Sequence, residues 1–138
     1  MLPRTPWIPV VISLRANILT SSEVWSNAAF LFPAAFMGYH HMIPGAILAL
    51  LVCVASTLYH ASDRKWWHLF DVISAYSLVM HNAIILALSH FKEPYTLAAC
   101  LSVAVGFYYF YAKGKDDWEW HIVSAIITLI CALAYAQS

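Results

Sequence analysis

The sequence has very little charge for its length. Only 10% of its 138 residues are Asp, Glu, Lys or Arg, and 62% are hydrophobic. A soluble domain usually carries about 25% charged residues. A water-soluble fold of this composition would have to expose much of its apolar surface. The composition therefore favours lipid as the solvent and one domain as the organisation.

Several signals of other protein classes are also missing. The chain has no N-x-S/T sequon, no internal repeat and no C-x-x-C pair. Cys53, Cys100 and Cys131 all lie inside apolar stretches, which predicts reduced packing residues. The basic residues are scattered without a run, which excludes nucleic acid as a predicted partner; they are Arg4, Arg15, Arg64, Lys65, Lys92, Lys113 and Lys115.

What the chain does have is long apolar stretches. A helix that spans a bilayer needs about 20 residues. Five stretches approach this length, at about 22–40, 43–60, 66–89, 94–112 and 117–136, and Pro33 is expected to kink the first. The short connections between them make sequential helices antiparallel. The pattern predicts an all-α, multi-pass integral membrane bundle of about five helices, which forms a single domain over residues 22–138.

Residues 1–21 differ in composition from the rest. They hold two Arg, several hydroxyl residues and no acid, since the first is Glu23. This composition suits a transit peptide. We predict instead an interfacial segment, with Trp7 at the level of the lipid headgroups and Arg15 reaching toward water.

The distribution of charge and aromatic residues predicts an orientation. With five passes, every basic residue except Lys92 falls on the same side as the N-terminus. The positive-inside rule places that side in the cytoplasm and the C-terminus across the membrane. Trp and Tyr at the segment ends form the expected aromatic belts; they are Trp25, Tyr39, Tyr59, Trp66, Trp67, Tyr95, Tyr111, Trp118 and Trp120.

Polar residues collect at the basic end of this predicted bundle. His60 ends the second segment, one turn after Ser56, and Asp71 lies near the start of the third. Asp117 and His121 open the fifth segment with the i, i+4 spacing that puts them on one face of a helix. The topology brings these side chains to one depth, and ionisable residues in membrane segments are costly and usually functional.

Two imidazoles and one or two carboxylates can hold Zn²⁺ with an open position for water. Zinc then lowers the pKa of the water so that it can attack a carbonyl group. Taken singly, each polar residue also fits a helix cap or an interfacial anchor. The run from Thr20 to Glu23 fits a capping box, and Asp117 fits an N-cap. We leave His40, His41, His68 and His90 as interfacial.

Near mid-membrane, His81 is the only ionisable residue. We interpret it as a buried hydrogen-bonding residue between helices. A channel or transporter would need polar groups along the whole bundle. Because the other polar residues lie at one end, the sequence disfavours that class.

Three stretches together resemble the CREST superfamily of membrane proteins. Residues 26–36 (SNAAFLFPAAF) are similar to a first-helix pattern of its GPI-processing phospholipase and myomaker branch. Residues 56–63 (STLYHASD) resemble the family's S-x-x-x-H, and 70–76 (FDVISAY) contain an Asp that matches its third-helix Asp. A fourth stretch, 117–125 (DWEWHIVSA), aligns with the H-x-x-x-H of the family's last helix. Alkaline ceramidases and the adiponectin and progestin receptors belong to the same superfamily.

The resemblance implies residue roles. Three histidines bind zinc in this family, and a Ser and an Asp act near the zinc-bound water. By position, His60 and His121 would be ligands, with Ser56 and Asp71 as the supporting pair. The chain departs from the family in two ways. Asp117 stands where the first His of the last motif is expected, and five predicted spans replace seven.

Two functions follow as expectations. The first is a small zinc-dependent hydrolase of an amide or ester of a membrane lipid, with zinc on His60, His121 and Asp117. Asp71 would act as general base or orient the ligands, and Ser56 would contact the water or the oxyanion. The second is a non-catalytic hydrophobic subunit of a larger membrane complex that keeps the fold and has other membrane subunits as partners.

Overall fold

The computed structural model describes residues 21–62, 65–113 and 117–138. In these ranges the chain is helical and has no strand, which confirms the all-α prediction. The helices are α1 (Ser22–Ser26), the 3-10 turn η2 (Asn27–Phe30), α2 (Leu31–Tyr39), α3 (Ile43–Ala61), α4 (Lys65–Leu88), α5 (Tyr95–Lys113) and α6 (Asp117–Ala136). The predicted segments match these bounds closely. The predicted interfacial segment lies almost wholly outside the described residues.

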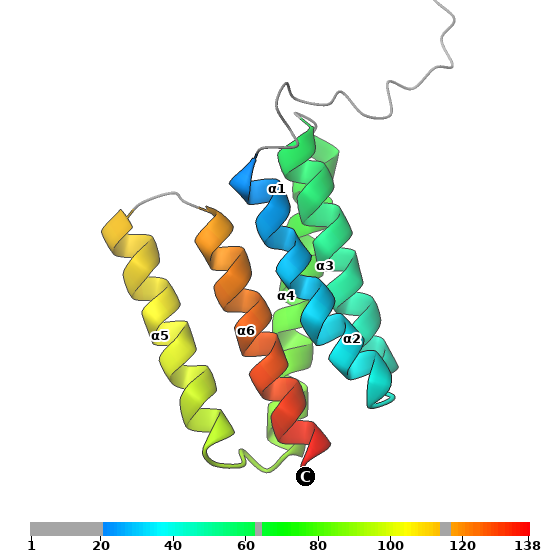
Figure 1. Ribbon diagram of the computed structural model, residues 1–138, viewed down its shortest axis with the longest axis vertical. Helices are drawn as coiled ribbons and strands as arrows, with labels where there is room; N and C mark the ends of the chain where they lie inside the picture. The colour runs from blue at the N-terminus through cyan, green and yellow to red at the C-terminus, as the bar shows by residue number, and fades with distance from the viewer. Residues whose placement is uncertain (1–20, 63–64, 114–116) are drawn as a thin grey trace, which may run out of the picture.

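The helices run up and down beside one another (Figure 1). α6 lies between α5 on one side and the run from α1 to α2 on the other, and it also packs on α4. α3 packs against α2 and α4, and its far end meets η2 and α1. α5 packs mainly against α6. The starts of α1, α4 and α6 therefore gather with the end of α3 at one end of the bundle, as the short connections predicted.

The first helical run is interrupted rather than continuous. Pro33 has no N–H to donate to the carbonyl group of residue 29, and its ring crowds that carbonyl. The backbone tightens into η2 directly before α2, one turn ahead of Pro33. The predicted kink is thus spread over a short 3-10 segment, and this segment positions two polar side chains described below.

Small side chains let the helices approach closely. Ala49 on α3 and Ala132 on α6 are fully buried in one core cluster, together with Met37 and Cys131. Small residues at helix contacts are typical of membrane bundles, where backbone proximity replaces the hydrophobic effect. All three cysteines are free thiols, but Cys100 is exposed on α5, so it is not the packing residue that we predicted.

Much of the outer surface is apolar. Large hydrophobic side chains point outward on every long helix, among them Phe32, at 74% exposure, and Met80, at 62%. Three stretches are long and apolar enough to cross a membrane: α3, α4 and residues Trp118–Ala136 of α6. These properties are compatible with a multi-pass membrane protein. A shorter apolar stretch lies in α5, over Tyr95–Tyr108.

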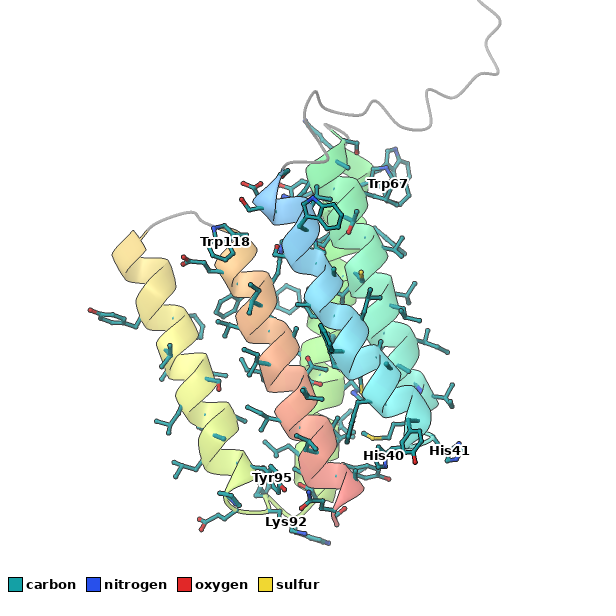
Figure 2. The ribbon with its side chains drawn as sticks, viewed as in Figure 1. His40, His41, Trp67, Lys92, Tyr95 and Trp118 are labelled. Atoms are coloured by element: carbon teal, nitrogen blue, oxygen red, sulfur yellow. The ribbon has the colours of Figure 1, made fainter. Side chains whose placement is uncertain are left out.

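Two histidines end helices through the left-handed backbone conformation. His41 has φ 59° and His90 has φ 54°. In each case the backbone N–H of the next residue bonds to the carbonyl group five residues earlier, Met42 to Met37 and Phe91 to Leu86. This is the Schellman pattern, which usually uses glycine. Figure 2 shows His40 and His41 at the end of the bundle opposite Trp67 and Trp118, so these histidines lie far from the polar cluster.

Candidate functional site

The polar cluster depends on the change from α-helix to 3-10 turn between α1 and η2. The backbone N–H of Asn27 bonds to the carbonyl groups of Val24 and Trp25. In a regular α-helix it would bond to the carbonyl group of Glu23. The Glu23 carbonyl oxygen instead accepts hydrogen bonds from two side chains, the Ser26 hydroxyl at 3.1 Å and the side-chain amide of Asn27 at 2.8 Å. The 3-10 turn therefore fixes the side chains of both residues, which are buried between α3 and α6.

His121 is the centre of the cluster. It lies on the second turn of α6 and is 9% exposed. Its Nδ1 is 2.8 Å from the Ser26 Oγ of the first helix, and its Nε2 is 3.3 Å from the Ser56 Oγ of α3. The imidazole thus bridges two other helices through a serine hydroxyl at each ring nitrogen, and the Glu23 backbone also lies within hydrogen-bonding reach of the ring. These contacts hold the orientation of the ring.

His60 lies beside this ring, at the last turn of α3. The ring centroids of His60 and His121 are 5.1 Å apart, with the rings edge to face. Ser56 precedes His60 by four residues, so both side chains occupy one face of α3. Because Nε2 of His121 contacts Ser56, it faces the side of α3 that also carries His60. The structure therefore brings His60, His121 and Ser56 together, as the topology predicted.

A carboxylate stands at the edge of this cluster. Glu23 belongs to the first turn of α1, outside the three candidate spans. The Ser21 hydroxyl donates to its Oε2 at 2.5 Å. The carboxylate lies close enough to the imidazoles of His60 and His121 to interact with both electrostatically.

The capping box predicted from Thr20 to Glu23 is not formed. The N-cap residue is Ser21, and its side chain makes no capping bond to the backbone. Its hydroxyl serves the Glu23 carboxylate instead. The reason is that the helix begins one residue later than the box requires, at Ser22. Thr20 itself lies outside the described residues.

The two aspartates predicted for the site, Asp71 and Asp117, lie near the starts of α4 and α6. Asp71 is half-buried on the second turn of α4. Ser74, one turn later, donates to the backbone carbonyl of Asp71 at 2.9 Å, so its hydroxyl serves the helix rather than a ligand. Asp117 is the first residue of α6, but its side chain lies outside the described part of the chain.

Within the described residues, no group of three or more His, Cys, Asp or Glu side chains is arranged to hold a metal ion. The distance between the two histidines nevertheless suits a shared metal. With Zn–N bonds of about 2.0–2.1 Å, two imidazoles on one tetrahedral zinc have ring centroids about 5 Å apart. The 5.1 Å between His60 and His121 fits this value, and Asp117 stands one turn before His121 in the sequence.

A second polar group lies deeper in the bundle, and it does not confirm the prediction that His81 bonds between helices. His81 Nδ1 is buried without a hydrogen-bond partner among the described residues. The bond between helices is made by its neighbour: the Asn82 amide group donates to Thr128 Oγ1 on α6 at 2.9 Å. Consecutive helical residues point about 100° apart. Asn82 therefore faces α6, while the His81 ring lies against Gly45 of α3.

Sequence reasoning gave neither Ser26 nor Asn27 a role in the site. A signal was present, because Glu23, Ser26 and Asn27 follow the i, i+3, i+4 spacing that shares one helix face. The signal did not show that this face points at α6. Only the packing of η2 against α6 makes Ser26 a partner of His121.

Comparisons of the chain with protein-family models, with curated proteins and with solved structures find no match. The site geometry and the sequence motifs are therefore the basis of the proposal that follows.

Proposed function

We propose that this chain is a small CREST-like membrane protein that works as a zinc-dependent hydrolase of lipid amide or ester bonds. The observation that carries the proposal is the approach of the His121 ring to the His60 ring, with centroids 5.1 Å apart, between α3 and α6. A buried imidazole that packs against a second imidazole is a costly arrangement in an apolar bundle, and such arrangements are usually functional.

The residues that would hold the metal are His60, His121 and Asp117. Zinc, when bound, supplies a Lewis acid that promotes attack of water on a carbonyl carbon. The carboxylate of Asp71 takes the proton from the attacking water and passes it to the leaving amine or alcohol as the C–N or C–O bond breaks. The Ser56 hydroxyl donates to the oxygen that becomes negatively charged.

The location of the cluster suits a lipid substrate. It lies at one end of an apolar bundle, in the region that the proposed topology assigns to a membrane interface. The carbonyl groups of membrane lipids lie close to this depth, where the polar headgroups meet the acyl chains. We further propose five passes, the kinked first run and α5 being added to α3, α4 and α6. The N-terminus and the site would then face the cytoplasmic leaflet.

The test is metal analysis of the purified full-length chain in detergent. We expect about one zinc per chain. His60→Ala and His121→Ala should each lose it, because each removes a ligand. His90→Asn is the matched control: it removes an exposed imidazole at the opposite end, and Asn tolerates the left-handed backbone there. Wild-type protein that is loaded with zinc and dialysed, yet retains none, would rule the proposal out.

The second candidate is a non-catalytic subunit of a larger membrane complex. It is favoured by the packing of α5, which contacts mainly α6 and exposes Leu97, Leu101 and Val105 on its outer side. In that case the chain should co-purify with other membrane proteins in mild detergent. His60→Ala and His121→Ala should then change only its stability.

A further inference from the structure

The protons around His121 can be counted, because each partner has only one to give. The Ser26 hydroxyl donates its proton to the Glu23 carbonyl oxygen at 3.1 Å. Its oxygen can then only accept from His121 Nδ1, which lies at 2.8 Å. The contact therefore requires a proton on Nδ1, since two lone pairs cannot form a hydrogen bond.

The other ring nitrogen gives the same result independently. Ser56 is 1% exposed, and in the described part of the chain its single hydrogen-bond partner is His121 Nε2. A buried hydroxyl without an acceptor is costly, because the group has lost its bond to water. The Ser56 proton therefore points to Nε2, which must carry a lone pair. The opposite tautomer would leave this hydroxyl unpaired and would break the bond from Ser26 to Glu23.

We infer that Ser26 is a positioning residue that holds His121 as the Nδ1–H tautomer and directs the Nε2 lone pair toward the His60 face of α3. The residues that fix the tautomer belong to the first helical run. The switch from α1 to η2 frees the Glu23 carbonyl, the carbonyl orients the Ser26 hydroxyl, and the hydroxyl sets the imidazole.

The two serines consequently have opposite effects on the affinity of His121 for a metal ion. Ser26 accepts from Nδ1–H, as the outer partner of a metal-binding histidine does, and loss of such a partner typically costs 10–100-fold in metal affinity. Ser56 donates to the same Nε2 lone pair that a metal would use, so it competes. This part of the inference rests on the proposed function, whereas the tautomer of His121 does not.

The first measurement is the tautomer itself. The full-length chain, labelled with ¹⁵N-histidine in detergent micelles, is examined by NMR near neutral pH, and His121→Gln identifies the signals of His121. We expect the proton on Nδ1 in the wild type. Because Ser56 still favours the same tautomer in Ser26→Ala, we expect a mixture of tautomers in Ser26→Ala/Ser56→Ala and recovery of the Nδ1–H form in Ser26→Thr/Ser56→Ala. A wild-type His121 with its proton on Nε2 overturns the inference without any variant.

The second measurement is Zn²⁺ affinity by competition with a chromophoric chelator. Ser26→Ala should bind zinc about 10–100-fold more weakly, whereas Ser56→Ala should bind as tightly as the wild type or more tightly. Ser102→Ala is the matched control, because that hydroxyl donates only to the Ala98 carbonyl of its own helix. Equal affinities for Ser26→Ala and wild type would contradict the positioning role. Absence of zinc binding in every variant would defeat the proposed function and leave the tautomer result to decide the inference.

Discussion

Individual residues in this bundle are constrained by how closely the helices approach, and Gly45 shows this most clearly. A Cβ at Gly45 would lie 2.5 Å from both His81 Cε1 and Met37 Sδ, two side chains that pack against α3. At Gly38, one turn of chain before α3 begins, a Cβ would meet nothing within 4 Å. The two glycines therefore have different reasons to be present. Gly45 leaves room for the His81 ring, and Gly38 has no packing reason.

We expect Gly45→Ala to destabilise the protein by about 1–3 kcal/mol, since the His81 ring and the Met37 side chain must move apart in a packed core. The measurement is unfolding of the chain in mixed micelles. Gly38→Ala is the matched control and should stabilise by about 0.5–1 kcal/mol, the usual gain from replacing a helical glycine. Two variants of equal stability would show that α3 does not contact His81 as described.

At the scale of elements, a buried side-chain hydrogen bond joins α4 to α6. The Asn82 amide group donates to Thr128 Oγ1, whose hydroxyl in turn donates to the Ser124 carbonyl at 2.9 Å. Thr128 is fully buried. Since the Thr128 proton is already used, only the amide nitrogen of Asn82 can face it, and this assigns the orientation of the amide. The bond specifies the register of the two helices that carry Asp71 and His121.

We expect Thr128→Val, which keeps the shape and removes the hydroxyl, to destabilise the chain by about 0.6–1.7 kcal/mol, the range for hydrogen bonds between membrane helices. Thr96→Val is the control, because among the described residues the Thr96 hydroxyl bonds only to the Lys92 carbonyl one turn earlier. Unfolding in the same micelles compares them. A loss at Thr96 as large as that at Thr128 would argue against a specific link between α4 and α6.

At the scale of the whole molecule, the alternating direction of the helices separates two ends (Figure 1). Lys65 starts α4 at the end that holds the His121 cluster, and Ser138 follows α6 at the other. The apolar outer surface lies between these ends. If the proposed five passes are correct, the two ends face opposite sides of the membrane.

We expect Lys65→Cys and Ser138→Cys to react with a membrane-impermeant thiol reagent from opposite sides of sealed vesicles. The background is a chain in which Cys53, Cys100 and Cys131 are replaced by Ala, since all three are free thiols. Labelling after permeabilisation provides the control for each position. Reaction of both cysteines from one side would contradict an odd number of passes between Lys65 and Ser138.

Helix positions were largely predictable because they depend on local, repeated properties. The length of each apolar stretch and the turn residues between stretches indicated α3, α4, α5 and α6 to within about two residues. The meeting of His60 with His121 was also predictable, since short connections allow few arrangements of neighbouring helices. These inferences needed only spacing along the chain.

The atomic partners depended on the tertiary structure. Spacing cannot reveal that the first run tightens at η2, that Ser26 then reaches Nδ1 of His121, or that Asn82 rather than His81 bonds across to α6. Rotation of a helix by one residue, about 100°, exchanges such neighbours without changing the apolar pattern. Composition and periodicity decided that this chain is a helical bundle with stretches apolar enough to cross a membrane and with a polar end. The packing of α6 against η2 and α3 decided which nitrogen of His121 faces which helix.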